Sequence, residues 1–482
     1  MRHIAFPVLL GAAALLAGCT VGPDYHGPPP FPPQGAEADH FVRQGDMPSA
    51  TGAPISRWWE ALGDPTLDAL VARAITANPN VAIMEARLRQ ARASLRLERA
   101  NLAPSGSASA LYAHAHFPGI NLGESGGDSS GGGTVTDLNL YNIGFDASWE
   151  VDLFGGQRRT VEAARANVQA AQANLADAQV SLSAEIAQAY VNLRDRQRRI
   201  ALNTRSVAMQ EQMLALSRQR YDRGTASRLD IRRLENQLES TRADVIPLRA
   251  EFEAYLDELA TLTGDAPGTL DASLTPERPL PLPPARIAIG DPAALLQRRP
   301  DIRAAERSLA AATAKIGTAE AARFPRLSFM GIIGIGGTKP GDLTNLDDFT
   351  ALAAPQLSWS FLDFGRNAAR VRQAKGARDE AQAQYRATVL SALRDAEDSL
   401  SRFRYRRITV ATLARAKAAA DEAAALSEQR YRAGTATLID QLDAERQQIA
   451  AAQSLSVAEA GLTSDFIAIH KALGLGWTTP AD

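Results

Sequence analysis

The side chains that most often carry out chemistry are few in this sequence, and they do not combine into a catalytic set. His114 and His116 are two positions apart, so on a strand they would share one face, as two metal ligands must. No third ligand accompanies them in the sequence. The glycine-rich run 331–339 resembles a phosphate-binding loop but lacks the Gly-Lys-Ser/Thr sequence and the helix that follows it in such loops. We therefore expect no enzyme activity, no metal and no cofactor.

Acidic side chains form a second candidate group, on a predicted strand. Within a predicted hairpin at 105–153, apolar and polar residues alternate from Tyr141 onwards, which is the period of a strand with two different faces. The polar face carries Asp146, Glu150 and Asp152. A Gly/Ser-rich loop separates the two strands of this hairpin.

A fifteen-residue stretch that occurs twice sets the organisation of the chain. Residues 216–230 return as 426–440, with nine of fifteen positions identical at an offset of 210. A repeat of this length indicates a duplicated domain half rather than a solenoid. The predicted parts are a first repeat at 56–264, a linker at 265–291, a second repeat at 292–474 and a tail at 475–482.

Long runs with apolar residues every seven positions predict helices in coiled-coil packing. The long helices are predicted at 157–222, 227–264, 366–432 and 437–474, with a shorter helix at 301–324 and a second hairpin at 325–363 whose last strand includes Trp359 and Phe361. At 1.5 Å per residue, the longest would span about 100 Å. Pro247 should kink its helix, and Pro355 should cause a bulge in its strand.

The N-terminus has the composition of a secretory signal. Arg2 precedes a short apolar run, and Leu16-Ala-Gly leads to Cys19, which resembles the signal of bacterial lipoproteins. Residues 1–18 are therefore predicted to be the signal peptide, and the Pro-rich residues 19–55 a tether. The resemblance implies acylation of Cys19, whose several acyl chains would anchor the protein stably in outer-membrane lipid.

Composition limits the remaining possibilities. A net charge of -2 and a pI near 6.4 give no basic field, so nucleic acid is not an expected partner. After the signal, no apolar stretch reaches the roughly 20 residues of a membrane helix. A membrane-crossing part would therefore consist of strands, and four strands cannot close a barrel, which needs about eight. Three chains would supply twelve strands and twelve helical rods, so a homotrimer is the simplest closed form.

Several motifs spread over nearly the whole mature chain point to one family. They are Cys19-x-Val21-Gly-Pro-Asp-Tyr25, Trp58-Trp59, Asp64-Pro65, Asn78-Pro79, Leu153-Phe154-Gly155, Arg299-Pro300-Asp301, Phe324-Pro325, Phe364-Gly365-Arg366 and the two Tyr-x-x-Gly-Thr turns. With these motifs the chain resembles the TolC/OprM-like outer-membrane efflux factor family, in its NodT-like lipoprotein branch. The resemblance implies a mainly α, internally duplicated chain that forms a trimeric twelve-strand β-barrel, a twelve-rod α-helical barrel and an equatorial belt.

The resemblance also implies a function. The chain would be the passive exit duct of a tripartite efflux system for drugs, toxic compounds or metals. Its partners would be a periplasmic adaptor and an inner-membrane pump of the resistance-nodulation-division class. Two alternatives stay open. One is the duct of a type I protein secretion system, and the other is a periplasmic coiled-coil scaffold lipoprotein without a pore.

The resemblance places the functional residues at the two repeated turns, which would form the periplasmic tip. The residues expected to dock the adaptor are Tyr221, Gly224, Thr225, Asp230, Tyr431, Gly434 and Thr435. A purely structural interpretation stays open, since glycine permits a chain reversal and Ser or Thr can cap the next helix. Ile439, Asp440 and Asp443 lie close together on one helix and align with the pore-constricting positions of OprM-like members. His114 and His116 would be polar residues of the pore lining.

The acidic strand face generates a prediction of ion selectivity. If Asp146, Glu150 and Asp152 line the pore, their negative charges should favour cations. Reversal potentials measured across planar bilayers in a salt gradient should then show cation preference. A channel that prefers anions would contradict this assignment.

Overall fold

The computed structural model describes residues 20–28, 40–45, 56–116, 137–289, 292 and 298–477. The predicted signal peptide and Cys19 lie outside these residues, as does the Gly/Ser-rich loop of the first hairpin. The chain divides into two compact units. The first comprises Met1–Pro28, Arg89–Gln169 and Glu306–Ala383, and the second comprises Pro29–Leu88, Ala170–Ala305 and Gln384–Asp482.

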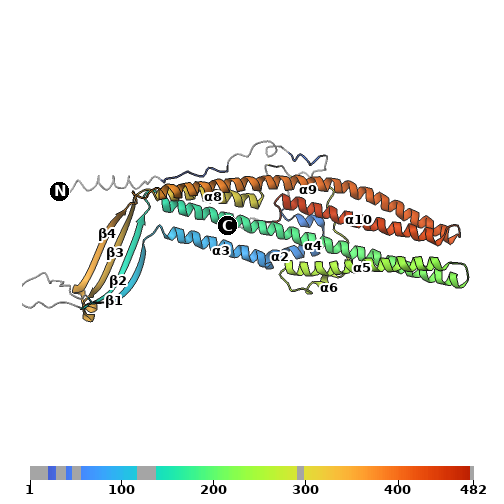
Figure 1. Cartoon of the computed structure of the whole chain (residues 1–482), viewed down its shortest axis with the longest axis horizontal. Coiled ribbons are helices and arrows are strands. Elements are labelled where there is room, and N and C mark those ends of the chain that lie inside the picture. Colours follow the sequence, from blue (N-terminus) through green and yellow to red (C-terminus); the bar gives the residue numbers. More distant parts are fainter. Residues whose placement is uncertain are drawn as a thin grey trace, which may run out of the picture. The chain divides into compact units, whose positions relative to one another are not determined.

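The first unit contains a four-stranded antiparallel sheet in the order β1-β2-β3-β4 (Figure 1). Its strands are β1 (Ser105–His116), β2 (Asp137–Val151), β3 (Arg326–Gly337) and β4 (Phe349–Ser358), with the 3-10 turns η2 (Pro340–Thr344) and η3 (Leu346–Asp348) between the last two. Each repeat contributes one hairpin, as predicted, and β2 of the first pairs with β3 of the second. Strands β1 and β4 are left at the edges.

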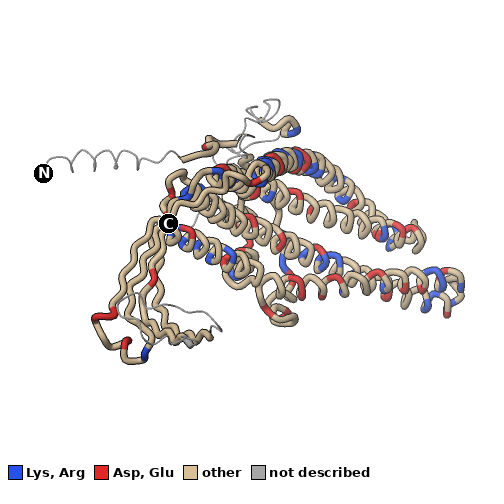
Figure 2. The backbone as a smooth tube through the Cα atoms, turned by 60° about the vertical axis from the view of Figure 1, so that its left-hand side comes forward, with Lys and Arg blue, Asp and Glu red and all other residues tan. Residues whose placement is uncertain are grey.

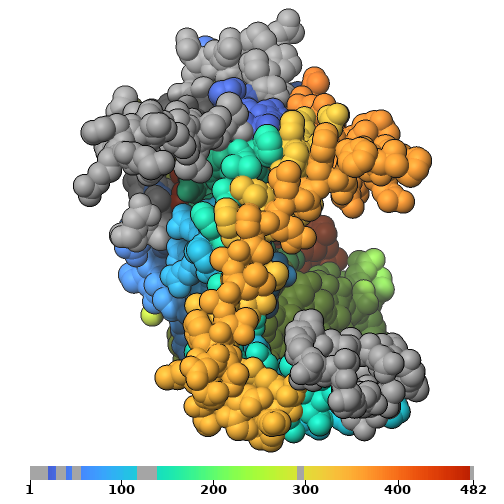
Figure 3. All heavy atoms as spheres, turned by 90° about the vertical axis from the view of Figure 1, so that its left-hand side faces the viewer, coloured from blue at the N-terminus to red at the C-terminus, as the bar shows by residue number. Residues whose placement is uncertain are grey.

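The pairing register gives this sheet one apolar face. Ile143 pairs with Ile335 and Phe145 pairs with Ile333, so large side chains adjoin across the strands. These side chains are exposed in the single chain, Phe145 to 68%. In the space-filling view, β3 and β4 form one continuous column of yellow and orange atoms (Figure 3). An exposed apolar surface of this kind indicates contact with lipid or with another protein.

Aromatic pairs bound the apolar face at both ends. The rings of Tyr112 and Tyr141 lie 4.9 Å apart at one end, and those of Trp149 and Phe329 lie 6.1 Å apart at the other. Eight residues of β2 separate the two pairs, which corresponds to about 26 Å along the strand. This length and the aromatic borders match the apolar band of a membrane β-barrel, about 25 Å tall between aromatic girdles.

The predicted position of two histidines is wrong. His114 pairs with Asn139, and its Nδ1 lies 2.9 Å from the Asn139 Oδ1 atom. His116 pairs with Asp137. Directly paired residues share a face, so these histidines continue the face of Tyr112, beyond its ring, and do not lie on the face of the acidic residues. The face therefore turns polar where the apolar band ends.

The predicted bulge at Pro355 is also wrong. Phe329 pairs with Pro355 and Leu327 with Leu357, and the register continues without an inserted residue along β4. An edge strand tolerates proline when its nitrogen faces away from the neighbouring strand. The strand ends at Ser358, so the predicted strand residues Trp359 and Phe361 follow it.

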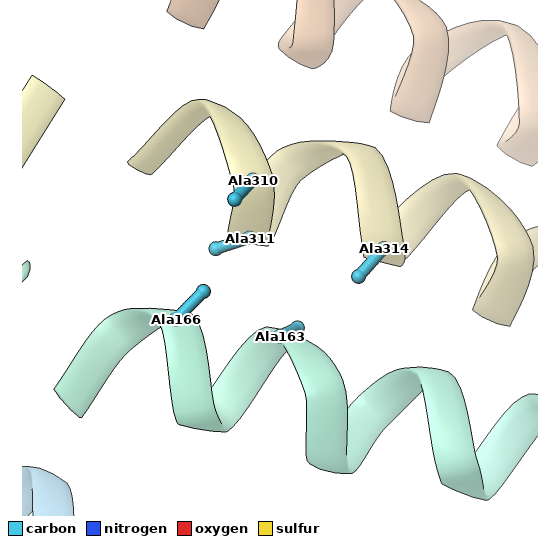
Figure 4. Close-up of a cluster of buried hydrophobic side chains, with 5 residues drawn as sticks. All are labelled: Ala163, Ala166, Ala310, Ala311 and Ala314. Atoms are coloured by element: carbon cyan, nitrogen blue, oxygen red, sulfur yellow. The ribbon is translucent and has the colours of Figure 1, made fainter. Parts of the chain in front are cut away.

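Helices join the strands and make up most of the chain. The two longest, α4 (Gly156–Asp222) and α9 (Arg366–Arg432), have 67 residues each and run through both units, while the shorter α3 (Pro79–Ala100) and α8 (Pro300–Ala321) have 22 each. In the first unit, the buried apolar cluster between α4 and α8 consists of alanines: Ala163, Ala166, Ala310, Ala311 and Ala314 (Figure 4). Such small side chains allow close approach but bury little apolar surface.

The remaining helices belong largely to the second unit. They are η1 (Trp58–Leu62), α2 (Pro65–Ala77), α5 (Arg228–Leu262), α6 (Asp271–Leu274) and α10 (Leu438–Ala472). Helix α2 begins directly after Asp64, whose side chain caps it by accepting from the Thr66 and Leu67 backbone N–H groups at 2.8 and 3.4 Å. Pro247 lies inside α5, which continues through it.

Charge is distributed unevenly over these elements. Lys, Arg, Asp and Glu are frequent along the helices and rare on the strands (Figure 2). Among the residues that the model describes, no helix has the length and apolar character needed to cross a membrane.

Two aromatic rings of the second unit pack against the buried side chain of His470. The His470 ring lies 5.3 Å from the Trp58 ring and 4.2 Å from the Phe466 ring. Its Nδ1 lies 2.9 Å from the Phe466 carbonyl oxygen. Burial lowers the pKa of His470 from 6.5 to about 4, so the ring is neutral in the folded protein.

This burial predicts acid sensitivity. Below pH 6.5 the unfolded chain binds a proton at His470 that the folded chain does not, so stability present above that pH is lost as the pH falls toward 4. The complete loss corresponds to roughly 3 kcal/mol. A His470→Gln variant should therefore lose less stability than the wild type between pH 7 and pH 4.5 in apparent Tm measurements. The exposed His40→Gln variant is the control, and equal acid sensitivity of the His470→Gln variant and the wild type would contradict the prediction.

Candidate functional site

The two repeated turns have the same backbone structure. In the first, the Thr225 N–H donates to the Arg220 carbonyl oxygen at 2.8 Å and the Gly224 N–H to the Tyr221 carbonyl oxygen at 2.8 Å. This pair of bonds is a Schellman motif, and it requires the left-handed conformation that Gly224 adopts with φ +76°. The second turn repeats both bonds from Thr435 and Gly434 at 2.9 and 3.0 Å.

Each turn leads directly into a capped helix. The Ser227 hydroxyl accepts from the Asp230 N–H at 3.1 Å, while the Ser227 N–H donates to the Asp230 carboxylate at 3.2 Å. Thr437 and Asp440 make the same reciprocal pair at 3.2 and 2.9 Å. These are capping boxes with aspartate in the acidic position. Bonds from Thr437 lower the pKa of Asp440, so this carboxylate is ionised and held at the helix terminus.

Local structure thus explains the repeated glycines, threonines and aspartates, but not the repeated tyrosines. Tyr221 is exposed to 44%. Tyr431 lies beneath Arg220, whose guanidinium carbon is 5.1 Å from the ring centroid. The first turn therefore contacts the second through a cation–π pair that the sequence did not reveal.

A cavity of about 500 Å³ lies between the two turns. Asp230 and Leu234 of α5 line one side, and Ile439 and Asp443 of α10 line the other. Leu438 and Leu442 pack against the neighbouring apolar cluster of Leu214, Leu234 and Leu238. The structure therefore brings predicted site residues of both repeats together within one chain.

Asp443 has a basic partner. Its carboxylate accepts from Arg446 Nη2 and from Gln447 Nε2, each at 2.7 Å, and these bonds lower its pKa. The i,i+3 spacing of Asp443 and Arg446 was available in the sequence, yet the prediction of Asp443 as a pore-constricting residue took no account of Arg446. Asp440 makes different contacts from Asp443, because the Asp440 carboxylate caps the start of the helix.

The three predicted lumen acids do not form one group. Asp146 accepts from the Ser109 hydroxyl at 2.8 Å, and Glu150 pairs with Ser328 on the same face of the sheet. Asp152 lies beyond the end of β2, where it accepts from the N–H groups of Gln157 and Arg158 at 3.1 and 2.8 Å. Its position on the strand was wrongly predicted, because a helix N-terminus competes for the carboxylate.

Within the described residues, no group of three or more His, Cys, Asp or Glu side chains could hold a metal ion.

A family model described as "Outer membrane efflux protein" matches residues 70–265 and 292–475. The chain belongs to the outer membrane efflux protein family.

Members of this family cover the chain almost completely. Nodulation protein T of Rhizobium leguminosarum bv. trifolii is 30% identical over 469 residues, with 97% of this chain and 96% of the relative covered. Outer membrane protein OprJ of Pseudomonas aeruginosa is 29% identical over 489 residues, covering 99% and 97%. The predicted family and outer-membrane location are confirmed, and the protein is an outer membrane efflux protein.

Solved structures of the family have the same fold. The outer-membrane channel OprN is 36% identical, with a TM-score of 0.85 and 95% and 100% of the two chains covered. The open state of the Neisseria gonorrhoeae channel MtrE is 28% identical, with a TM-score of 0.81 and coverage of 95% and 98%. These similarities confirm the predicted fold class, and these structures are of channels.

The capping boxes predict how the turns respond to substitution. Thr437→Ala removes a cap worth about 1 kcal/mol, which corresponds to a roughly fivefold change in an opening equilibrium. Amide hydrogen exchange in the first turn of α10 should accelerate by that factor, and Ser227→Ala should do the same in α5 only. Thr409→Ala, in the middle of α9, is the control. Unchanged exchange in both capping variants would contradict the assignment.

Proposed function

We propose that three copies of this chain form the passive exit duct of an efflux system. The apolar face of the four-stranded sheet carries this proposal, since it ends in aromatic pairs and is exposed in the single chain. Lipid is the environment that such a face suits. The edges β1 and β4 would each leave unpaired backbone groups there, which lipid does not tolerate. Three times four strands give a closed barrel of twelve.

The duplicated helices support the same assembly. Each chain contributes α4 and α9 with 67 residues each, and each repeat also has a pair of shorter helices, α3 with α5 or α8 with α10, with 57 residues in total. By the 1.5 Å rise, 67 residues span about 100 Å. Four rods per chain would give a tube of twelve, continuous with the barrel through β2–α4 and β4–α9.

The proposed partners follow from the two turns and from the relatives. An adaptor would dock on the exposed turn residues, among them the Tyr221 side chain. Relatives include a pyoverdine export outer membrane protein and a toluene efflux pump outer membrane protein. We therefore propose small toxic or exported compounds as cargo, an inner-membrane pump as the energy source, and acylated Cys19 as an additional lipid anchor.

The aperture would lie at the second turn. Ile439 and Asp443 line the cavity beside the turns, and threefold symmetry would repeat both around the axis. Asp440 would act on the aperture through the helix start that it caps. Arg446 next to each Asp443 would moderate the repulsion among three carboxylates.

The assembly is tested with purified, detergent-solubilised protein. Native mass spectrometry should give a mass of three chains, and the same preparation should form conducting channels in planar bilayers. A monomer whose barrel is already closed, or a trimer without any conductance, would overturn the proposal.

The aperture assignment has its own test. Asp443→Ala should raise single-channel conductance severalfold, because it removes three side chains from the constriction. Arg446→Gln should keep conductance low and increase cation preference. Glu235→Ala, at the first turn, is the matched control and should leave conductance at the wild-type value. Conductance that is unchanged by Asp443→Ala would remove Asp443 from the aperture.

A further inference from the structure

The cavity between the two turns has more basic than acidic side chains in its lining. Its charged lining residues are Arg220, Arg233, Arg446, Asp230 and Asp443. The Asp443 carboxylate pairs with Arg446, and the Asp230 carboxylate accepts from the Ser227 hydroxyl at 2.7 Å. Both acids therefore have donors within the chain.

Two of the three arginines in the lining have no acidic partner. The nearby Arg218 and Arg232 both pair with Glu235, whereas Arg220 and Arg233 form no ion pair with any described residue. Arg220 lies near the end of α4 and Arg233 near the start of α5. A guanidinium group offers several N–H donors in one plane, which suits the oxygens of a carboxylate, sulfonate or phosphate group.

A buried hydroxyl adds a further donor. Ser217 lines the same cavity and is only 1% exposed. Its hydroxyl makes no hydrogen bond to another residue in the part of the chain that the structure describes. Because buried polar groups normally have a hydrogen-bond partner, this hydroxyl is available to an acceptor inside the cavity.

The remaining lining of the cavity is largely apolar. Leu234 of α5 faces it from one side, and Ile439 and Leu442 of α10 face it from the other. The volume of about 500 Å³ is in the range of pockets that hold small molecules. A complementary ligand therefore combines one anionic group with an apolar body.

The first turn has a positive charge that its repeat lacks. Residues 216–233 contain six arginines and two aspartates, whereas the aligned residues 426–443 contain two arginines and three acids (Figure 2). A local excess of one sign of charge raises the concentration of oppositely charged ligands nearby. The sequence of the first turn thus favours anions at the cavity.

We propose that this cavity is a binding site for a small organic anion, whose carboxylate, sulfonate or phosphate group is held by Arg220 and Arg233. Its apolar body would lie against Leu234 and Ile439. The bound anion would connect the two turns, because the arginines belong to the first repeat and Ile439 belongs to the second. The site lies within one chain, so its test does not depend on the proposed duct.

Isothermal titration calorimetry with 2-naphthalenesulfonate tests the site in protein purified in an uncharged detergent. We expect saturable binding at one site per chain. Arg233→Gln should weaken it about tenfold, because a hydrogen bond between charged groups is lost. Arg232→Gln is the matched control, since this neighbouring exposed arginine is outside the cavity lining, and it should bind like the wild type.

The neutral 2-naphthalenesulfonamide separates recognition of charge from partition into detergent. It has the same ring system and should bind at least about tenfold more weakly than the sulfonate. Arg220→Gln should weaken sulfonate binding by a factor similar to that of Arg233→Gln. Equal affinities for the two compounds, or wild-type affinity in both arginine variants, would overturn the site.

Amide hydrogen exchange tests whether the anion connects the two turns. Saturating 2-naphthalenesulfonate should slow exchange in the first turns of both α5 and α10, and the sulfonamide at the same concentration should not. This protection should be reduced in Arg233→Gln and retained in Arg232→Gln. Protection confined to one of the two helices would show that the anion does not connect the turns.

Discussion

Unpaired backbone groups at the two edges of a four-stranded sheet are the constraint on which the structure depends. In water such edges are solvated, but the apolar face of this sheet excludes water as its environment. The chain alone therefore has no stable place for β1 and β4. In the proposed trimer, association of identical sheets would satisfy the edges and leave the apolar face available to lipid. The aromatic pairs at its two ends fix how far that face extends.

In the helical part, small side chains determine how closely neighbouring helices pack. Alanines between α4 and α8 let two helices from different repeats lie close together, and the Tyr25 ring packs against these alanines. At the other ends of the helices, the same Schellman and capping-box bonds occur twice. Duplication has thus preserved backbone geometry at the turns while side chains such as Arg220 and Arg446 give the two copies different surroundings.

Periodicity was sufficient to predict the elements of this fold. The seven-residue repeat gave the long helices almost to their ends, and alternation gave both hairpins. What failed depends on contacts between elements. The face of His114 needs the register between β1 and β2, and the tolerance of Pro355 needs its place at an edge. Asp152 was predicted on the strand, but its carboxylate caps the helix that follows, a role that backbone geometry decides. The burial of Arg159 carried no signal, because three of its acceptors, the Val21 and Gly22 carbonyl oxygens and the Asp24 carboxylate, lie far away in the sequence.

The hydrogen-bonded turns at Gly224 and Gly434 have a mechanical consequence. Each turn is closed by two backbone hydrogen bonds and is followed directly by a capped helix. Few residues between the two helices are therefore without a backbone hydrogen bond or a cap. A turn of this kind behaves as a rigid elbow rather than a hinge. Movement at this end must therefore come from rotation or bending of whole helical pairs, and the leverage of rods about 100 Å long would convert small angular changes into large displacements at their ends.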